Sequence, residues 1–113
     1  MTDIIKVLGQ IAAAATTVED LYTAPNLTQT TVSTLAICNT SAGSLTFRVS
    51  IHVADENPLT PTTKQYLFYD ASIDAGATVT VTIGITLGEN DVVKTYASAT
   101  GLAFNLFGVE TSV

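Results

Sequence analysis

The sequence has few cysteines, no tryptophan and no long apolar run. Its 113 residues include one cysteine, Cys38, so an intramolecular disulfide cannot form and the paired-cysteine spacings of zinc and redox sites are missing. The longest apolar run, 11–15, is far shorter than the roughly 18–20 residues that cross a bilayer. The first residues also lack the basic and apolar segments of a secretory signal. We therefore expect one soluble domain, made in a cytoplasm and without a membrane partner.

Basic residues are scarce. Four Lys and Arg stand against ten Asp and Glu, which gives a formal net charge of −6. Proteins that bind nucleic acid present a basic patch or stripe, so nucleic acid is not an expected partner. Charged residues make up only 12% of the chain, about half the usual quarter, and twenty threonines supply polarity instead. Because interface cores are depleted in charge, this composition favours a protein that assembles with others.

Polar and apolar residues alternate with a period of two over 45–53 and 78–87. This period is typical of β-strands with one buried and one wet face. It predicts that five side chains lie in the core and that Thr80 and Thr82 lie outside it. The five are Phe47, Val49, Ile51, Val81 and Ile83.

Weaker signals predict six further strands, near 4–10, 20–24, 31–39, 65–71, 92–97 and 103–110, with turn residues between them. The four alanines within 11–18 indicate an extended connection, because β-branched neighbours and short length disfavour a helix there. We predict an all-β fold, a single antiparallel β-sandwich of about eight short strands, either jelly-roll or Ig-like. In this division 1–19 form an N-terminal strand and connection that is part of the domain or packed on it, and 20–113 form the sandwich.

No constellation of residues indicates catalysis, a metal or a cofactor. His52, the one histidine, falls on the polar face of its strand, where an exposed or interface-lining role is expected. Cys38 lies in an apolar strand and is expected to be buried and inert. Asp55, Glu56 and Asn57 could begin a calcium site but lack EF-hand spacing, so we interpret them as solvated loop residues. The sequence therefore predicts no enzyme.

Two sets of residues could bind a partner. Arg48, the single arginine, lies on the polar side of its strand, where its guanidinium could bind a carboxylate through two hydrogen bonds or stay exposed in solvent. The four tyrosines could instead form a carbohydrate platform, although packing is the default interpretation of each. They are Tyr22, Tyr66, Tyr69 and Tyr96.

The order of strand-like segments resembles that of small all-β virion proteins of tailed bacteriophages. The resemblance runs over nearly the whole chain and is carried by 6–10, 21–25, 32–39, 47–49, 82–87, 91–93 and 104–110. It implies a non-enzymatic virion protein synthesised in the host bacterial cytoplasm. No collagen-like, coiled-coil or peptidoglycan-cleaving segment accompanies these strands, which favours a capsid decoration (cement) protein on the capsid surface. The alternative is a tail, neck or fibre module that binds a host receptor or glycan.

A decoration protein would have the major capsid protein and further copies of itself, as a homotrimer, for partners. The candidate interface residues are Lys6, Ile11, Arg48 and His52. With few cationic side chains available, apolar and hydroxyl-rich contacts should dominate attachment. We expect the N-terminal stretch through Ile11 and the connection at 12–17 to supply them.

Overall fold

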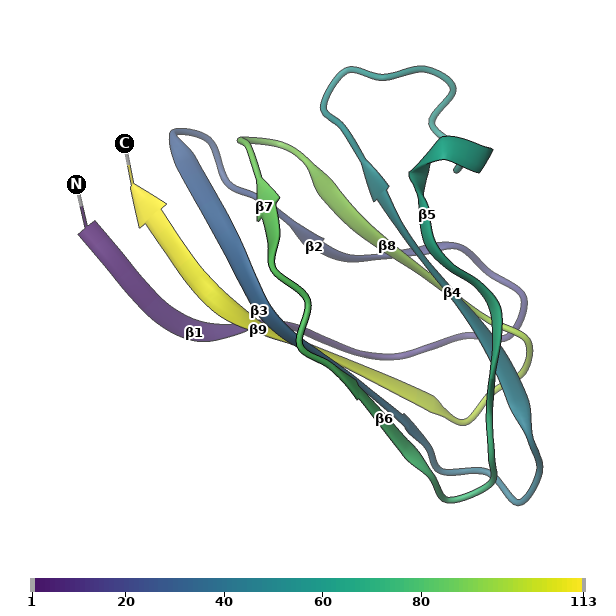
Figure 1. Ribbon diagram of the computed structural model, residues 1–113. Helices are drawn as coiled ribbons and strands as arrows, with labels where there is room; N and C mark the ends of the chain where they lie inside the picture. Colours follow the sequence, from purple (N-terminus) through teal and green to yellow (C-terminus); the bar gives the residue numbers. More distant parts are fainter. Residues whose placement is uncertain (1, 113) are drawn as a thin grey trace.

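Nine strands form two antiparallel sheets that pack face to face in the computed structural model, which describes residues 2–112 (Figure 1). Sheet A contains β1 (Thr2–Ala12), β9 (Leu102–Ser112), β3 (Thr28–Asn39), β6 (Thr78–Val81) and β7 (Ile85–Leu87), in the order β1-β9-β3-β6 with β7 also paired to β3. Sheet B contains β2 (Glu19–Thr23), β8 (Val92–Ala97), β4 (Leu45–His52) and β5 (Tyr66–Ile73), in the order β2-β8-β4-β5. A single 3₁₀ turn, η1 (Thr63–Gln65), precedes β5. The predicted all-β sandwich is confirmed.

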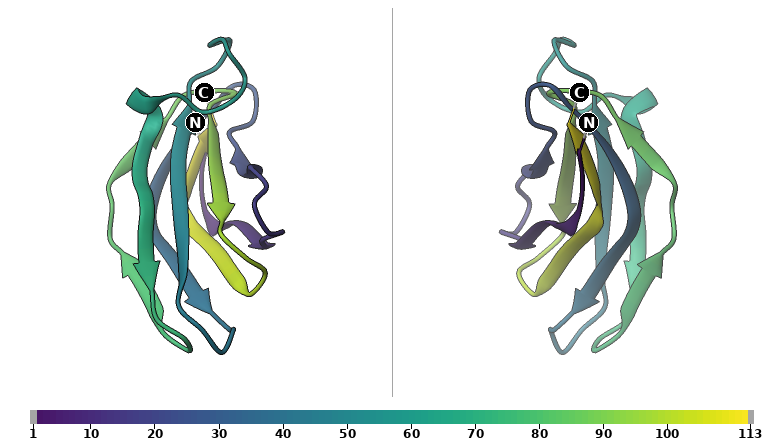
Figure 2. Two further views of the ribbon diagram at one scale, coloured as in Figure 1. Left: turned by 90° about the vertical axis from the view of Figure 1, so that its right-hand side faces the viewer. Right: turned by 90° about the vertical axis from the view of Figure 1, so that its left-hand side faces the viewer.

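The connections between strands identify the sandwich as a jelly roll. The chain changes sheet at nearly every connection, and only the β4–β5 hairpin and the β6–β7 link stay within one sheet. In an Ig-like sandwich several successive strands share a sheet, whereas jelly rolls interleave the two sheets in this way. Figure 2 shows sheet B facing the viewer in its left view and sheet A in its right view.

The core lies between the sheets and is centred on Phe47 of β4 and Phe104 of β9. Both side chains are almost wholly buried, and their ring centroids lie 6.3 Å apart in an edge-to-face arrangement. Such aromatic pairs add stabilisation beyond the area they bury. Val49 is buried beside them, as predicted. Ile51, Val81 and Ile83 are only half-buried, while Thr80 and Thr82 are exposed.

The segment 78–87 is two strands, and this corrects the predicted count of eight. Thr82, Ile83 and Gly84 lie outside the ladder, and the amide of Ile85 donates to the carbonyl of Ile83 in a tight turn. Polar and apolar residues keep alternating through this turn, so the sequence pattern does not reveal it.

The turn between β6 and β7 lies where sheet A bends. The pairing register of β1 with β9 shifts between Val7 and Gly9, and that of β3 with β9 shifts between Val32 and Thr34. Bulges of this kind bend a sheet locally. Gly108 of β9 lies at the bend, where a Cβ atom would clash with the backbone oxygen of Thr31. The half of sheet A that carries both chain ends thus curves away from sheet B (Figure 1).

The N-terminal region is built into the sandwich. β1 pairs along its length with β9, and Ala13, just beyond it, is buried in the core. The connection that follows is extended, with an isolated bridge between Ala15 and Ala97. Over residues 2–112, no helix has the length and apolar character needed to span a membrane.

A matched pair of glycine substitutions tests the bend. Gly108→Ala should lower the free energy of unfolding by roughly 1–3 kcal/mol, because its Cβ has no space beside the backbone of β3. Gly84→Ala places its Cβ where no atom lies within 4 Å and should change stability by less than about 1 kcal/mol. Urea unfolding followed by circular dichroism measures both, and equal losses would contradict the close packing at Gly108.

Candidate functional site

The outer face of sheet A is almost free of charge. Residues paired across antiparallel strands share a face, so the ladder of sheet A places one set of side chains opposite the core. These eighteen residues, here called the neutral face, are Asp3, Ile5, Val7, Gln10, Ala12, Gln29, Thr31, Thr34, Ala36, Cys38, Thr78, Thr80, Thr86, Ala103, Asn105, Phe107, Val109 and Thr111. Only Asp3 among them is charged, and its carboxylate accepts a hydrogen bond from Thr111 at 2.8 Å.

The apolar part of the neutral face lies near the chain ends. Ile5 is 85% exposed and pairs with Val109, while the neighbouring pair is Val7 and Phe107. Four apolar side chains therefore adjoin one another on two strands. Exposed apolar patches bounded by polar residues are typical of protein interaction sites. Cys38, expected in the core, instead lies half-buried on this face beside Ala103.

The outer face of sheet B has a different chemistry, with a clamped arginine at its centre. The guanidinium of Arg48 donates to Asp70 through Nε at 2.6 Å and Nη2 at 3.3 Å. Its Cζ atom lies 4.3 Å from the ring centroid of Tyr69 and 4.4 Å from that of Tyr96. Bidentate pairing and stacking are the two interactions for which arginine is best suited. The hydrogen bonds with Arg48 hold the pKa of the Asp70 carboxyl below its usual value.

A β-bulge in β5 brings two of these residues opposite Arg48. Phe47 pairs with Ala71 and Val49 with Phe68, so Tyr69 and Asp70 both face the single residue Arg48. Asp70 adopts a φ of 52°, a left-handed conformation that Asp tolerates better than most residues. Bulges often re-aim side chains in this way. A period-two pattern cannot reveal a bulge, so the sequence indicated that Arg48 could bind a carboxylate but not that Asp70 supplies it.

His52 lies on the predicted face of β4, but it is only 5% exposed. Of the two roles expected for His52, the exposed one is wrong, because the β4–β5 loop covers the side chain. Its Nε2 atom lies 2.9 Å from the carbonyl oxygen of Glu56, and Nδ1 lies 3.4 Å from the side-chain amide of Gln65. Both ring nitrogens thus have partners, which leaves neither free to act as a base.

Glu56 is a structural residue of the same loop. Its carboxylate accepts a hydrogen bond from the side-chain amide of Gln65 and forms an ion pair with Lys64 at 2.9 Å, and the bond with Lys64 lowers the pKa of Glu56. This carboxylate is therefore already paired, unlike the expected solvated acid. In the part of the chain that the structure describes, no three His, Cys, Asp or Glu residues gather in a way that could hold a metal ion.

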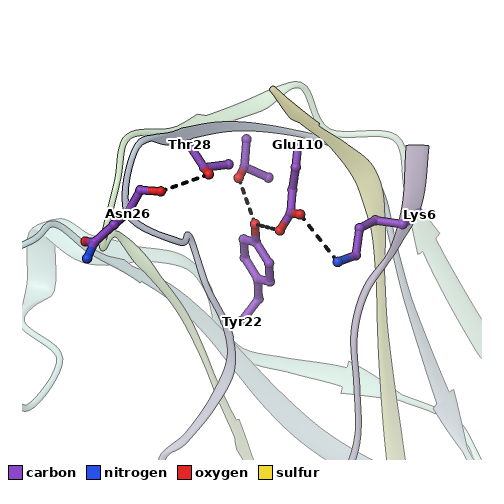
Figure 3. A network of polar contacts seen from close by, with 6 residues as sticks. Lys6, Tyr22, Asn26, Thr28 and Glu110 are labelled. Atoms are coloured by element: carbon purple, nitrogen blue, oxygen red, sulfur yellow. Dashed lines mark hydrogen bonds and ion pairs between the residues drawn. The ribbon is translucent and has the colours of Figure 1, made fainter. Parts of the chain in front are cut away.

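The fourth tyrosine, Tyr22, is separate from the other three and links the two sheets. Its buried hydroxyl lies 2.8 Å from Thr30 Oγ1 and donates to Glu110, which also pairs with Lys6 at 3.3 Å (Figure 3). Burial, followed by the bond to Glu110, raises the pKa of Tyr22 to about 12. The network closes the gap where sheet A curves away, so Tyr22 and Lys6 serve the fold.

The four candidate interface residues do not form one site. Lys6 is bound to Glu110, and Ile11 packs against the core. Arg48 is held by Asp70, and His52 lies under its loop. The structure instead gathers the neutral face on sheet A and the aromatic residues around Arg48 on sheet B. Scarcity of charge was the only sequence signal for the neutral face, and the strand register was needed to place it.

The jelly-roll fold has counterparts among solved virus structures. A chain from the structure of infectious bursal disease virus, Gx strain, matches with a TM-score of 0.55 and 12% identity. A chain from the structure of the Gt strain of the same virus matches with a TM-score of 0.50 and 8% identity. Each match covers 96% of this chain and 32% of the virus chain, so the protein spans about a third of the length of the chains it resembles.

No protein-family model matches the chain, and no curated protein matches its sequence. At 8–12% identity, the likeness to the virus chains is one of fold. The expected resemblance to a virus protein is thus confirmed at the level of fold, while its tailed-phage origin stays a prediction.

The Arg48–Asp70 pair should make stability depend on pH. Because the folded-state pKa of Asp70 is lowered, its contribution is present above the unfolded value of about 3.9 and is lost as the pH falls through the folded value. Asp70→Asn should therefore be less stable than wild type at pH 7, and the difference should shrink below about pH 4. Urea midpoints at both pH values measure it. Asp55→Asn is the control, since Asp55 also has a positive φ, of 63°; an equal pH effect there would contradict the assignment.

Proposed function

We propose that this protein is a non-enzymatic structural protein of a virus particle, and more narrowly a capsid decoration protein of a tailed phage. The observation that carries the proposal is the jelly-roll fold, which matches a chain of a virus structure over 96% of the present chain. The sequence resemblance to small virion proteins of tailed phages supports the narrower statement. The engagement of both His52 nitrogens supports a role without catalysis.

The neutral face is the surface best suited to bind the shell, with the major capsid protein as the partner. Burying charged side chains costs free energy unless each is paired, whereas this face offers hydroxyl, amide and apolar groups. Its apolar patch around Ile5 and Val7 supplies area that gains from leaving water. A protein that binds the assembled lattice but not its disrupted state stabilises that lattice by linkage. Bridging of neighbouring capsomers would thus oppose rupture.

Deleting the N-terminal region cannot test whether this region attaches the protein to the shell. Removing 1–17 would unpair one edge of β9 and take Ala13 from the core, so the truncated protein would lose stability together with any contact. Point substitutions on the outer face of β1 separate the two effects. The homotrimer stays a prediction, which light scattering of the purified protein at high micromolar concentration tests.

The number of copies per particle tests the proposed function directly. A decoration protein follows the symmetry of the shell, so quantitative mass spectrometry of purified virions should find it in hundreds of copies, in simple ratio to the major capsid protein. A handful of copies would support the alternative of a neck, tail or fibre module. Absence from purified particles would contradict both.

A second experiment tests the neutral face. Purified variants are added back to particles that lack the protein, and occupancy is measured by sedimentation. Ile5→Asp should lower occupancy strongly, because it places a charge in the apolar patch, while wild-type binding should persist at about 0.5 M salt, where exposed charges are screened.

Leu59→Asp is the matched control for this substitution. Leu59 is 73% exposed in the β4–β5 loop, so the exchange makes the same charge change away from the neutral face. Equal losses from both variants, or release of the intact protein by salt alone, would contradict attachment through this face.

A further inference from the structure

A hollow lies on the outer face of sheet B, beside the Arg48 clamp. It has a volume of about 510 Å³ and is lined by Pro61, Thr62, Thr63, Tyr66 and Tyr69. The hollow and these five residues are here called the aromatic corner. This volume falls within the roughly 300–1,000 Å³ typical of small-molecule sites. The Tyr66 and Tyr69 rings meet at 82° with centroids 4.9 Å apart, so two walls of the hollow are perpendicular aromatic rings.

The aromatic corner is rigid although it is exposed. Tyr69 is 58% exposed, yet its ring is held against Arg48, which Asp70 and Tyr96 fix in turn. On the other side, Gln65 stabilises the η1 turn, because its side-chain oxygen accepts a hydrogen bond from the backbone amide of Thr62. An exposed aromatic ring that is already immobilised loses little entropy when a ligand binds. Packing of the core does not account for this support, because Tyr69 lies outside the core.

The chemistry of the aromatic corner selects an uncharged ligand that carries hydroxyl groups. None of its five lining residues is charged, and the nearby Arg48 and Asp70 neutralise each other. Within residues 2–112, the hydroxyls of Tyr66 and Tyr69 make no hydrogen bond to the protein, whereas that of Tyr22 has two partners. Aromatic faces and free hydroxyls together match a sugar ring, which has an apolar C–H face and a polar rim.

We propose that the aromatic corner binds a neutral sugar residue, stacked on the tyrosine rings and hydrogen-bonded by their hydroxyls and that of the exposed Thr63. The site goes beyond the proposed function and does not depend on it. The two outer faces of a sandwich point in opposite directions, so a copy bound to a shell through the neutral face would present this corner to the surroundings.

Saturation-transfer NMR on the purified protein tests the site. The probes are methyl glycosides of neutral hexoses and N-acetylhexosamines, with the methyl glycoside of N-acetylneuraminic acid as an anionic probe and a proline-rich peptide as the alternative occupant of an aromatic groove. Wild type should bind at least one neutral glycoside, and Tyr69→Ala should weaken that binding about tenfold or more. Thr80→Ala, on the neutral face, should bind like wild type.

Further variants separate binding from folding. Tyr69→Phe keeps the ring and should lose less affinity than Tyr69→Ala, and Thr63→Met should block the hollow from an exposed position of η1. Thermal unfolding checks that each variant is folded. The proposal would be overturned if no neutral glycoside bound wild type, or if only the anionic probe or the peptide bound. Equal binding by wild type, Tyr69→Ala and Thr63→Met would also overturn it. Particle occupancy is a separate measurement, so the proposed function can fail or stand independently.

Discussion

The pairing of β9 with β1 and β3 is the interaction on which the rest of the structure depends. β9 is the last strand of the chain, yet it lies between the first and the third and contributes Leu102, Phe104 and Leu106 to the core. Among residues 2–112, β1 pairs with no strand other than β9, so sheet A cannot be completed until β9 is in place. Long-range closure of this kind is entropically costly and slows folding. It also fixes the position of both chain ends, since Thr2 pairs with Ser112.

The bend in sheet A determines where the core ends. Gly9 packs closely against the backbone of Leu21 in β2, and Gly108 against that of Thr31 in β3. Beyond these glycines β1, β9 and β3 curve together away from sheet B (Figure 1). Tyr22 spans this space with a polar bond to Glu110, and Lys6 compensates the carboxylate. A buried charge is tolerated only with such partners. The network is therefore a consequence of the bend, and its residues are committed to the fold.

Much of the fold could be predicted from the sequence, and so could some residues of the candidate sites, such as Tyr66 and Tyr69, but not how either site is arranged. The alternation of polar and apolar residues placed Phe47 and Val49 in the core, because period two reports which face of a strand is buried. It could not show that the β4–β5 loop covers His52, because the loop residues that contact this side chain lie outside the alternating strand. The bulge that sets Tyr69 and Asp70 against Arg48 is also invisible to it. The low charge of the chain was evident, but only the register of sheet A gathers neutral residues on one face.

The jelly roll keeps the two outer faces independent. Apart from the β6–β7 turn within sheet A, the connections lie at the two ends of the sandwich, and half of the ten acidic residues lie in them. These are Asp55, Glu56, Asp74, Glu89 and Asp91. The net charge of −6 that favours solubility is therefore displaced from the neutral face, which remains suited to contact with another protein. On the opposite sheet, the Arg48–Asp70 pair supports exposed rings without leaving a net charge beside them. Side chains on one face can thus change without disturbing the other, because the core separates them. The proposed attachment through the neutral face and the proposed sugar site on sheet B are therefore compatible within one small domain.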